Sequence, residues 1–145
     1  MKQLDFHYNV MRRTIYACKL VKKVTGLGLT AALWSSDEAF LKTVYDDLWR
    51  FEDMAFIAHA WAGSATQSES SVVFSTDIAS LTGRDVLVLL DDNVPDNWRE
   101  VFDRFDRVVD IVGKSPEELT ASRARYRLYK ASGVPLKAYD RSKSA

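Results

Sequence analysis

The apolar positions of the chain follow two periods in turn, which predicts alternating strands and helices. Short segments that alternate apolar and polar residues, or that are apolar throughout, are typical of β-strands. By this criterion the predicted strands span residues 4–8, 29–34, 55–61, 71–77, 85–92 and 107–113. The segment "AGSATQSES" between two of them is small and polar, so it is predicted to be a surface loop.

Longer segments between these strands repeat their apolar residues every three to four positions, as amphipathic helices do. Asn9 is expected to cap a first helix, which ends at the glycines of "TGLGL". Ser35 or Ser36 is expected to cap a second helix that extends to Trp49. Residues 97–105 are predicted to form a short third helix.

The last predicted helix, over residues 115–133, has the most complete start and stop signals. Ser115 is the expected N-cap, Pro116 occupies the first helical position, and Glu118 completes a capping box. Gly133 is expected to end the helix.

Strands that alternate with helices predict an α/β fold, in which helices cover both faces of a mostly parallel sheet. The segment "DVLVLLDD" is apolar almost throughout, as expected of a parallel strand covered on both sides. A chain of 145 residues with 47% apolar side chains can bury the core of one domain. We therefore predict a single domain over residues 1–139 and a disordered polar tail over residues 140–145.

The charge, the cysteine content and the apolar segments argue against a nucleic-acid-binding, secreted or membrane-spanning protein. Twenty basic and twenty acidic side chains give a formal net charge of zero, so the molecule as a whole has no electrostatic footprint for nucleic acid. Cys18 is the single cysteine, and the start "MKQLDFHYNV" lacks the apolar core of a signal peptide. No apolar segment approaches the roughly 20 residues that span a bilayer. These features predict a soluble cytoplasmic protein.

Phosphate-binding signals are missing at the expected places. The segment "TGLGLTAAL" has no third glycine at the required spacing and leads into a strand, whereas the dinucleotide motif leads into a helix. The sequence contains no G-x-x-x-x-G-K-[ST] motif. Asp91 and Asp92, at the end of an apolar strand, resemble magnesium ligands, but the polar turn that follows favours a turn-forming role.

The sequence contains no cluster of residues typical of a metal site or a nucleophilic centre. His7 and His59 lie in predicted strands without a second histidine or cysteine at ligand spacing. Cys18 falls inside an amphipathic helix, where a buried thiol is the usual case. We therefore expect no metal, no cofactor and no catalytic residues.

The segment "SRARYRLYKASG" gathers basic and aromatic residues near the end of this neutral chain. At about 100° per residue, one arc of the helix carries Arg123, Tyr126, Arg127 and Lys130. The small apolar side chains of another face are expected to pack on the sheet; they are Ala124, Leu128 and Ala131. The cations can simply complement the helix dipole, or they can bind an anion such as a carboxylate-bearing peptide.

Aromatic residues are dense around the second helix and the strand that follows it. Trp49 and Phe56 flank the segment "RFEDMA", and Trp61 comes soon after. Such residues either fill the core or anchor a protein interface. The sequence alone leaves both interpretations open.

Taken together, these segments resemble the chi subunit of bacterial DNA polymerase III. The resemblance rests on "DDLWRFEDMAFIAHAWAG", "DVLVLLDDNVPDNW", "RVVDIVG" and "SRARYRLYKASG", and it covers most of the chain. It implies a three-layer α/β/α domain that looks like a nucleotide-binding fold but has no phosphate loop. It also implies a non-catalytic accessory subunit in the bacterial cytoplasm, at replication forks on the nucleoid.

The resemblance implies two protein partners. Members of this family bind the acidic, phenylalanine-ended C-terminal tail of single-stranded DNA-binding protein, and they bind the psi subunit, which connects them to the clamp loader. The tail-binding positions correspond here to Val112, Arg123, Tyr126, Arg127, Lys130 and Gly133. The psi-binding positions correspond to Trp49 and Phe56.

One position of this motif departs from the family pattern. Leu119 stands where family members can have a lysine, one helical turn before Arg123, and this removes a charge from the site. An alternative function is direct binding of single-stranded nucleic acid through the same basic helix. The zero net charge argues against that alternative.

Overall fold

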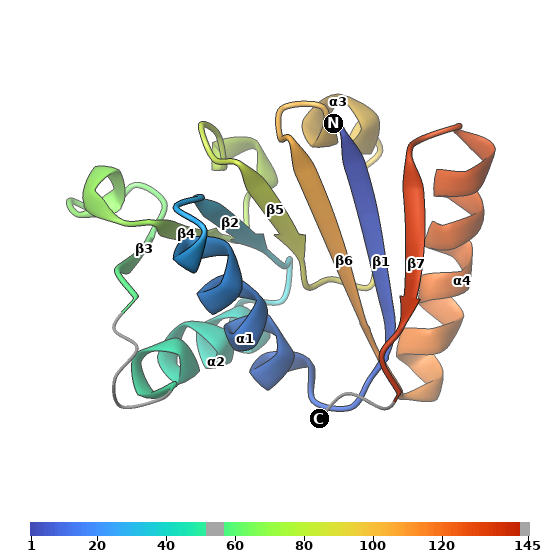
Figure 1. Cartoon of the computed structure of the whole chain (residues 1–145), viewed down its shortest axis with the longest axis horizontal. Helices are drawn as coiled ribbons and strands as arrows, with labels where there is room; N and C mark the ends of the chain where they lie inside the picture. The colour runs from blue at the N-terminus through green and yellow to red at the C-terminus, as the bar shows by residue number, and fades with distance from the viewer. Residues whose placement is uncertain (52–56, 143–145) are drawn as a thin grey trace.

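The computed structural model describes residues 1–51 and 57–142, which form a parallel β-sheet between two layers of helices (Figure 1). Within these residues the sheet has seven strands, in the order β3-β4-β2-β5-β6-β1-β7. The strands are β1 (Gln3–Val10), β2 (Ala31–Trp34), β3 (His59–Trp61), β4 (Val72–Ser75), β5 (Val86–Leu89), β6 (Arg107–Gly113) and β7 (Leu136–Asp140). Every pairing between neighbouring strands is parallel. The predicted α/β class with a mostly parallel sheet is confirmed.

The helices lie on both faces of the sheet. They are α1 (Arg13–Gly26), α2 (Glu38–Arg50), α3 (Trp98–Phe102) and α4 (Pro116–Ala131), with short 3-10 turns η1 (Gln67–Glu69) and η2 (Ile78–Ser80). Helices α1 and α2 pack on one face, and α3 and α4 pack on the other. No helix among the described residues is long and apolar enough to cross a membrane.

Strand β5 shows how the sequence builds the two cores. Val86 and Val88 point into the core under α1 and α2, whereas Leu87 and Leu89 point into the core under α3 and α4. Because successive side chains of a strand face opposite ways, a strand buried on both sides must be apolar throughout. This is the pattern that predicted the strand.

The start of α1 differs from the prediction. Asn9 belongs to β1, where it adopts a left-handed backbone conformation with φ of 60°. The helix begins four residues later at Arg13, and its N-cap residue Arg12 makes no side-chain capping bond. Asparagine tolerates this conformation better than most residues, so the signal that suggested a cap marks an irregular strand end.

The cap of α2 is Asp37, whose carboxylate accepts a hydrogen bond from the backbone N–H of Phe40. Ser35 and Ser36, the predicted caps, instead donate their hydroxyls to Asp91 at 3.1 and 2.7 Å. The serines therefore hold the turn before the helix, and they precede its N-cap residue Asp37 by two and one residues.

The predicted disordered tail, residues 140–145, begins too early. Asp140 is the last residue of β7, a strand that the sequence pattern did not reveal. Its carboxylate accepts a hydrogen bond from Asn9 Nδ2 at 3.1 Å, and the backbone N–H of Arg141 donates to Tyr8 O at 2.9 Å. Residues 143–145 lie outside the described residues. An edge strand is hard to detect because most of its side chains are exposed.

Candidate functional site

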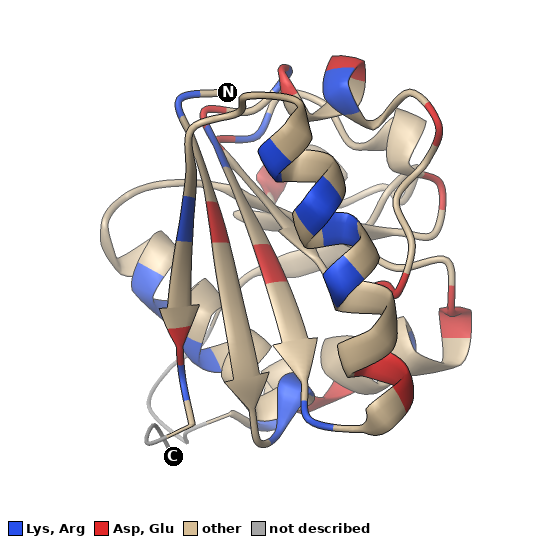
Figure 2. Cartoon of the chain, turned by 90° about the vertical axis from the view of Figure 1, so that its right-hand side faces the viewer, with Lys and Arg blue, Asp and Glu red and all other residues tan. Residues whose placement is uncertain are grey.

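Helix α4 carries a row of basic residues along its length and acidic residues in its first turn (Figure 2). Its start is built as predicted: the Ser115 hydroxyl accepts a hydrogen bond from Glu118 N at 3.2 Å, with Pro116 in the first turn. Ser115 Oγ also donates to Glu118 Oε1 at 2.9 Å. Gly133 follows the helix with φ of 69°, the left-handed conformation that ends helices.

The face of α4 that packs on the sheet is not the predicted one. The buried residues are Ser122, Arg125 and Tyr129, whereas Leu128 is 39% exposed. Ala124 and Ala131, also expected to pack inward, are exposed as well. Arg125 points inward because it binds a carboxylate in the sheet.

That carboxylate belongs to Asp110, at the centre of β6. Arg125 binds it with two parallel hydrogen bonds, from Nε at 2.9 Å and from Nη2 at 3.0 Å. The Tyr129 hydroxyl donates to the same carboxylate at 2.8 Å, and Arg125 Nη1 donates to Asp92 O at 2.6 Å. Arg125 is 4% exposed and Asp110 is fully buried.

This buried network sets the rotation of α4. Burial alone would lower the pKa of Arg125, but the Asp110 carboxylate outweighs burial and raises that pKa above its ordinary value. Burial, and then the same carboxylate, raises the pKa of Tyr129. With Arg125 held inward, Arg123 and Arg127 must point to other sides of the helix.

A cleft of about 520 Å³ lies between α4 and the edge of the sheet formed by β1 and β7. Arg123, Tyr126 and Arg127 line it from the helix, and Phe6 and Tyr8 line it from β1. The rings of Phe6 and Tyr126 meet edge to face with centroids 5.2 Å apart. The cleft therefore combines an aromatic wall with two exposed guanidinium groups.

The remaining predicted site residues lie outside the lining of this cleft. Val112 is 1% exposed and packs in the same core as Tyr126. Lys130 is exposed on the next turn of α4, and Gly133 is exposed just beyond its end. Leu119 does line the cleft, so the departure from the family motif places an apolar side chain there.

The sequence did not identify the strand side of the cleft. Phe6 and Tyr8 face α4 because they alternate along β1 with Asp5 and His7, which face the other way. Ala138 of β7 completes the wall. The period-two pattern of β1 was a usable signal, but nothing in the sequence indicated that α4 would lie across that strand.

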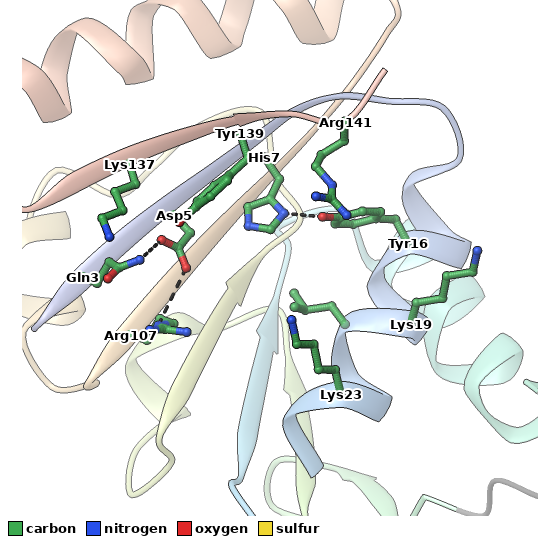
Figure 3. A pocket seen from close by; sticks show the side chains of 11 residues that line it. Gln3, Asp5, His7, Tyr16, Lys19, Lys23, Arg107, Lys137, Tyr139 and Arg141 are labelled. Atoms are coloured by element: carbon green, nitrogen blue, oxygen red, sulfur yellow. Dashed lines mark hydrogen bonds and ion pairs between the residues drawn. The ribbon is translucent and has the colours of Figure 1, made fainter. Parts of the chain in front are cut away.

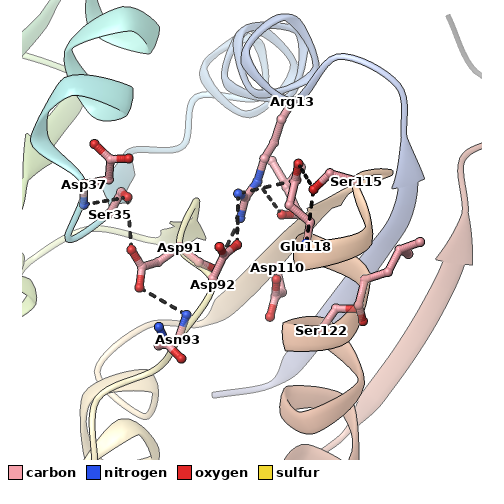
Figure 4. A network of polar contacts seen from close by, with 12 residues as sticks. Arg13, Ser35, Asp37, Asp91, Asp92, Asn93, Asp110, Ser115, Glu118 and Ser122 are labelled. Carbon is pink, nitrogen blue, oxygen red and sulfur yellow. Dashed lines mark hydrogen bonds and ion pairs between the residues drawn. The ribbon is translucent and has the colours of Figure 1, made fainter.

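Arg13 lies at the carboxyl ends of the central strands (Figure 4), where it lines a cleft of about 440 Å³. Its Nε donates a hydrogen bond to Ile111 O at 2.8 Å. Its Nη1 lies 3.7 Å from the Asp92 carboxylate and 3.7 Å from the Glu118 carboxylate. Burial lowers the pKa of Arg13, while nearby carboxylates oppose this. Ligands of open α/β sheets bind at this edge, and Arg13 places a positive charge in the lining of the cleft that lies there.

The Asp91 carboxylate joins its own turn to the loop before α2. It accepts hydrogen bonds from Ser35 Oγ, from the hydroxyl and N–H of Ser36, and from Asn93 N at 3.1 Å. The bond from Asn93 N is typical of a turn residue, and the three bonds from the serines hold the loop before α2 against the segment after β5. Within the described part of the chain, no three His, Cys, Asp or Glu side chains converge as a metal site.

A second group of aromatic side chains lies where α2 ends and β3 begins. Tyr45 stacks on Trp61 with centroids 4.9 Å apart, and Trp49 lies over His59 at 4.0 Å. Trp49 is 49% exposed. Phe56, the other residue predicted for this surface, lies outside the described residues. Trp61 packs against the core, whereas Trp49 is accessible to solvent.

Solved structures include chains with a similar fold. The C-terminal domain of the DEAD-box protein Dbp5 superposes with a TM-score of 0.61 at 12% identity, over 97% of this chain and 90% of that one. An S. cerevisiae Dbp5 chain bound to ADP gives the same TM-score at 10% identity, over 97% of this chain and 42% of that one. At such low identity the likeness concerns the fold alone.

Comparison with known sequences is more specific. DNA polymerase III subunit chi of Pseudomonas aeruginosa is 29% identical over 140 residues, which cover 94% of each chain. The family model for the DNA polymerase III chi subunit, HolC, matches residues 1–137. That match includes β1, the buried Asp110–Arg125 pair and the whole of α4. The chain therefore belongs to the family of DNA polymerase III chi subunits.

Proposed function

We propose that this protein is a non-catalytic replisome subunit whose α4 cleft binds the C-terminal tail of single-stranded DNA-binding protein. The carrying observation is that Arg123 and Arg127 flank an aromatic cleft formed with Tyr126 and Phe6. The tail that members of this family bind is acidic and ends in phenylalanine. Its charge and its terminal ring match the two kinds of group that the cleft presents.

The two parts of the cleft have different roles in this proposal. The guanidinium groups of Arg123 and Arg127 bind carboxylates of the tail, because their planar donors match paired carboxylate oxygens. The rings of Phe6 and Tyr126 give the terminal phenylalanine an apolar contact surface. Leu119 widens that surface, so this member relies more on apolar contact and less on charge at that turn.

Lys130 has a longer-range role. It lies outside the cleft lining on the same arc of α4, where its charge attracts an acidic chain before contact is made. Exposed charges of this kind are screened by salt over about 8 Å at physiological ionic strength. Raising salt should therefore slow association while the apolar contacts persist.

Isothermal titration with synthetic peptides tests this assignment. The native acidic tail peptide is expected to bind about tenfold or more tightly than a scrambled peptide of identical charge and length, because only the native order places the phenylalanine at the free carboxylate. Equal affinity for the two peptides would show that α4 merely attracts negative charge, and the proposal would be wrong.

We also propose that the surface around Trp49 binds the psi subunit and so connects the chain to the clamp loader. Trp49 is half exposed at the end of α2, on the face of the sheet opposite α4. Large exposed aromatic side chains are frequent anchors of protein interfaces. The family resemblance assigns Phe56 to the same partner.

Trp49→Ala and Phe56→Ala are each expected to weaken psi binding by about 2 kcal/mol or more, as loss of an interface anchor does, and to leave tail binding unchanged. Surface plasmon resonance with psi and titration with the tail peptide measure the two activities separately. Met11→Ala removes another exposed large apolar side chain elsewhere and serves as the control. Loss of both activities in a folded variant would disprove two independent surfaces.

A further inference from the structure

Within residues 1–51 and 57–142, no helix lies over one face of the sheet edge. Helix α1 packs nearer the middle of the sheet, so β1 and β7 are uncovered on the side opposite α4 (Figure 1). On this side lies a groove of about 470 Å³ between the strands and α1 (Figure 3). Asp5 and His7 of β1 form its floor, and Lys137 and Tyr139 of β7 form its outer wall. We refer to it as the β7 groove.

The β7 groove concentrates positive charge in a chain that is neutral overall. Its basic lining residues are Lys19, Lys23, Arg107, Lys137 and Arg141. Among the described residues, the single carboxylate in the lining is that of Asp5. Five cations and one anion leave a local charge of plus four. Asp5 is itself engaged, since it accepts a hydrogen bond from Gln3 and lies 3.7 Å from Arg107 Nε.

Aromatic rings lie between these cations. The ring centroid of His7 lies 5.1 Å from that of Tyr139 and 5.5 Å from that of Tyr16, and His7 Nδ1 contacts the Tyr16 hydroxyl. Burial lowers the pKa of His7 to about 4, so the ring is neutral at physiological pH. Tyr139 is 37% exposed on the open edge, which leaves part of its ring available to a ligand.

Arg141 adds a donor to the same groove. Its guanidinium carbon lies 5.7 Å from the centre of the Tyr16 ring. Its Nε atom is buried, yet it has no hydrogen-bond partner within the described part of the chain. Buried donors are normally satisfied because an unpaired one costs free energy. An anion in the groove would supply an acceptor for this side chain.

We propose that the β7 groove binds the sugar–phosphate backbone of single-stranded nucleic acid, with a base stacked on Tyr139. Proteins that bind single strands without sequence preference combine a basic groove with aromatic side chains on which bases stack. The groove volume suits one or two nucleotides, since ligand sites usually measure about 300–1,000 Å³. The site is separate from the α4 cleft, which lies on the other face of the sheet.

Charge and shape favour this ligand over two others. The bases of a duplex are stacked inside it and cannot reach Tyr139 without being unpaired. An acidic peptide would satisfy the cations but would leave the aromatic ring without a regular stacking partner. Each phosphate contact contributes about −0.7 to the slope of log affinity against log salt concentration. Few phosphates fit the groove, so few such contacts form. The isolated interaction is therefore weak and salt-dependent.

Fluorescence anisotropy of a labelled oligothymidylate tests the proposal on the intact chain. The double variant Lys137→Glu with Arg141→Glu is expected to weaken binding about tenfold or more and to make the salt slope shallower by about 0.7 per lost contact. Tyr139→Ala is expected to weaken binding by about fivefold or more, whereas Tyr139→Phe keeps the stacking ring and the affinity.

Controls separate this site from non-specific attraction. Lys42→Glu with Arg104→Glu makes the same charge change at exposed positions away from the groove, and it should leave most of the binding intact. All variants should retain tail-peptide binding, which shows that they are folded and does not depend on the β7 groove. An equal loss in the control pair, a loss confined to Arg123→Glu, or equal competition by a duplex or by polyglutamate would each overturn the proposal.

Discussion

Arg125→Ala is expected to lower the free energy of unfolding by about 3–5 kcal/mol, the usual effect of breaking a buried ion pair. The substitution leaves the Asp110 carboxylate buried with Tyr129 as its remaining side-chain partner. It also removes the hydrogen bond from Arg125 Nη1 to Asp92 O. Urea denaturation followed by circular dichroism measures the change.

Two comparisons make this expectation specific. Arg127→Ala, two residues further along the same helix, removes an exposed arginine and should change stability by less than about 0.5 kcal/mol. The double variant with Asp110→Ala should be less destabilised than the sum of the single variants, because no unpaired buried charge remains. Equal effects of Arg125→Ala and Arg127→Ala would mean that the buried pair contributes nothing to stability.

Arg123→Ala is expected to weaken binding of the acidic tail peptide by about 1.5–3 kcal/mol, the range for a hydrogen bond to a charged group. Removing the terminal phenylalanine of the peptide should cost about a further 2 kcal/mol, because it empties the aromatic part of the cleft. Titration of both proteins against both peptides gives a complete thermodynamic cycle. The two losses should add approximately, since the guanidinium and the ring contact different parts of the peptide.

Lys42→Ala is the matched control for this measurement, because it removes one positive charge from the exposed side of α2, on the other face of the sheet. It should leave peptide affinity within about twofold, with the small change disappearing at high salt. If Lys42→Ala and Arg123→Ala weaken binding equally, the tail responds to total charge and does not occupy the α4 cleft.

Local signals in the sequence were sufficient to predict most elements of the fold. Ser115, Pro116 and Gly133 mark the two ends of α4 correctly, because caps and stop signals act through contacts within a few residues. The apolar strand β5 and its neighbour β6 were also predicted, since burial on both faces leaves a continuous apolar pattern. These features do not depend on which other segment of the chain each element packs against.

The rotation of α4 depended on a contact that the sequence could not show. Arg125 resembles any solvated arginine until Asp110, fifteen residues earlier, is placed beside it. Ala124 and Leu128 were expected inside on hydrophobicity alone, and the buried ion pair overrides that preference. On the arc that carries the predicted basic residues, Arg123 and Arg127 are exposed, whereas Tyr126 packs against the core beside Phe6.

The walls of the cleft and of the β7 groove were missed for a related reason. Both are formed by β1 together with β7, a strand whose side chains are mostly exposed. Its pairing with β1 joins segments more than a hundred residues apart, such as Leu4 with Leu136. Such a long-range pairing leaves almost no trace in local sequence.

Strand β1 separates two solvent-facing surfaces by the thickness of one backbone. Phe6 and Tyr8 face the α4 cleft, while Asp5 and His7 face the β7 groove. Deleting a single residue from this strand would exchange the two sets, because side chains alternate with a period of two. A single substitution in β1 therefore changes one of these surfaces, whereas deletion of one residue from β1 changes both at once. Variation in chain length should accordingly be confined to the loops that flank this strand.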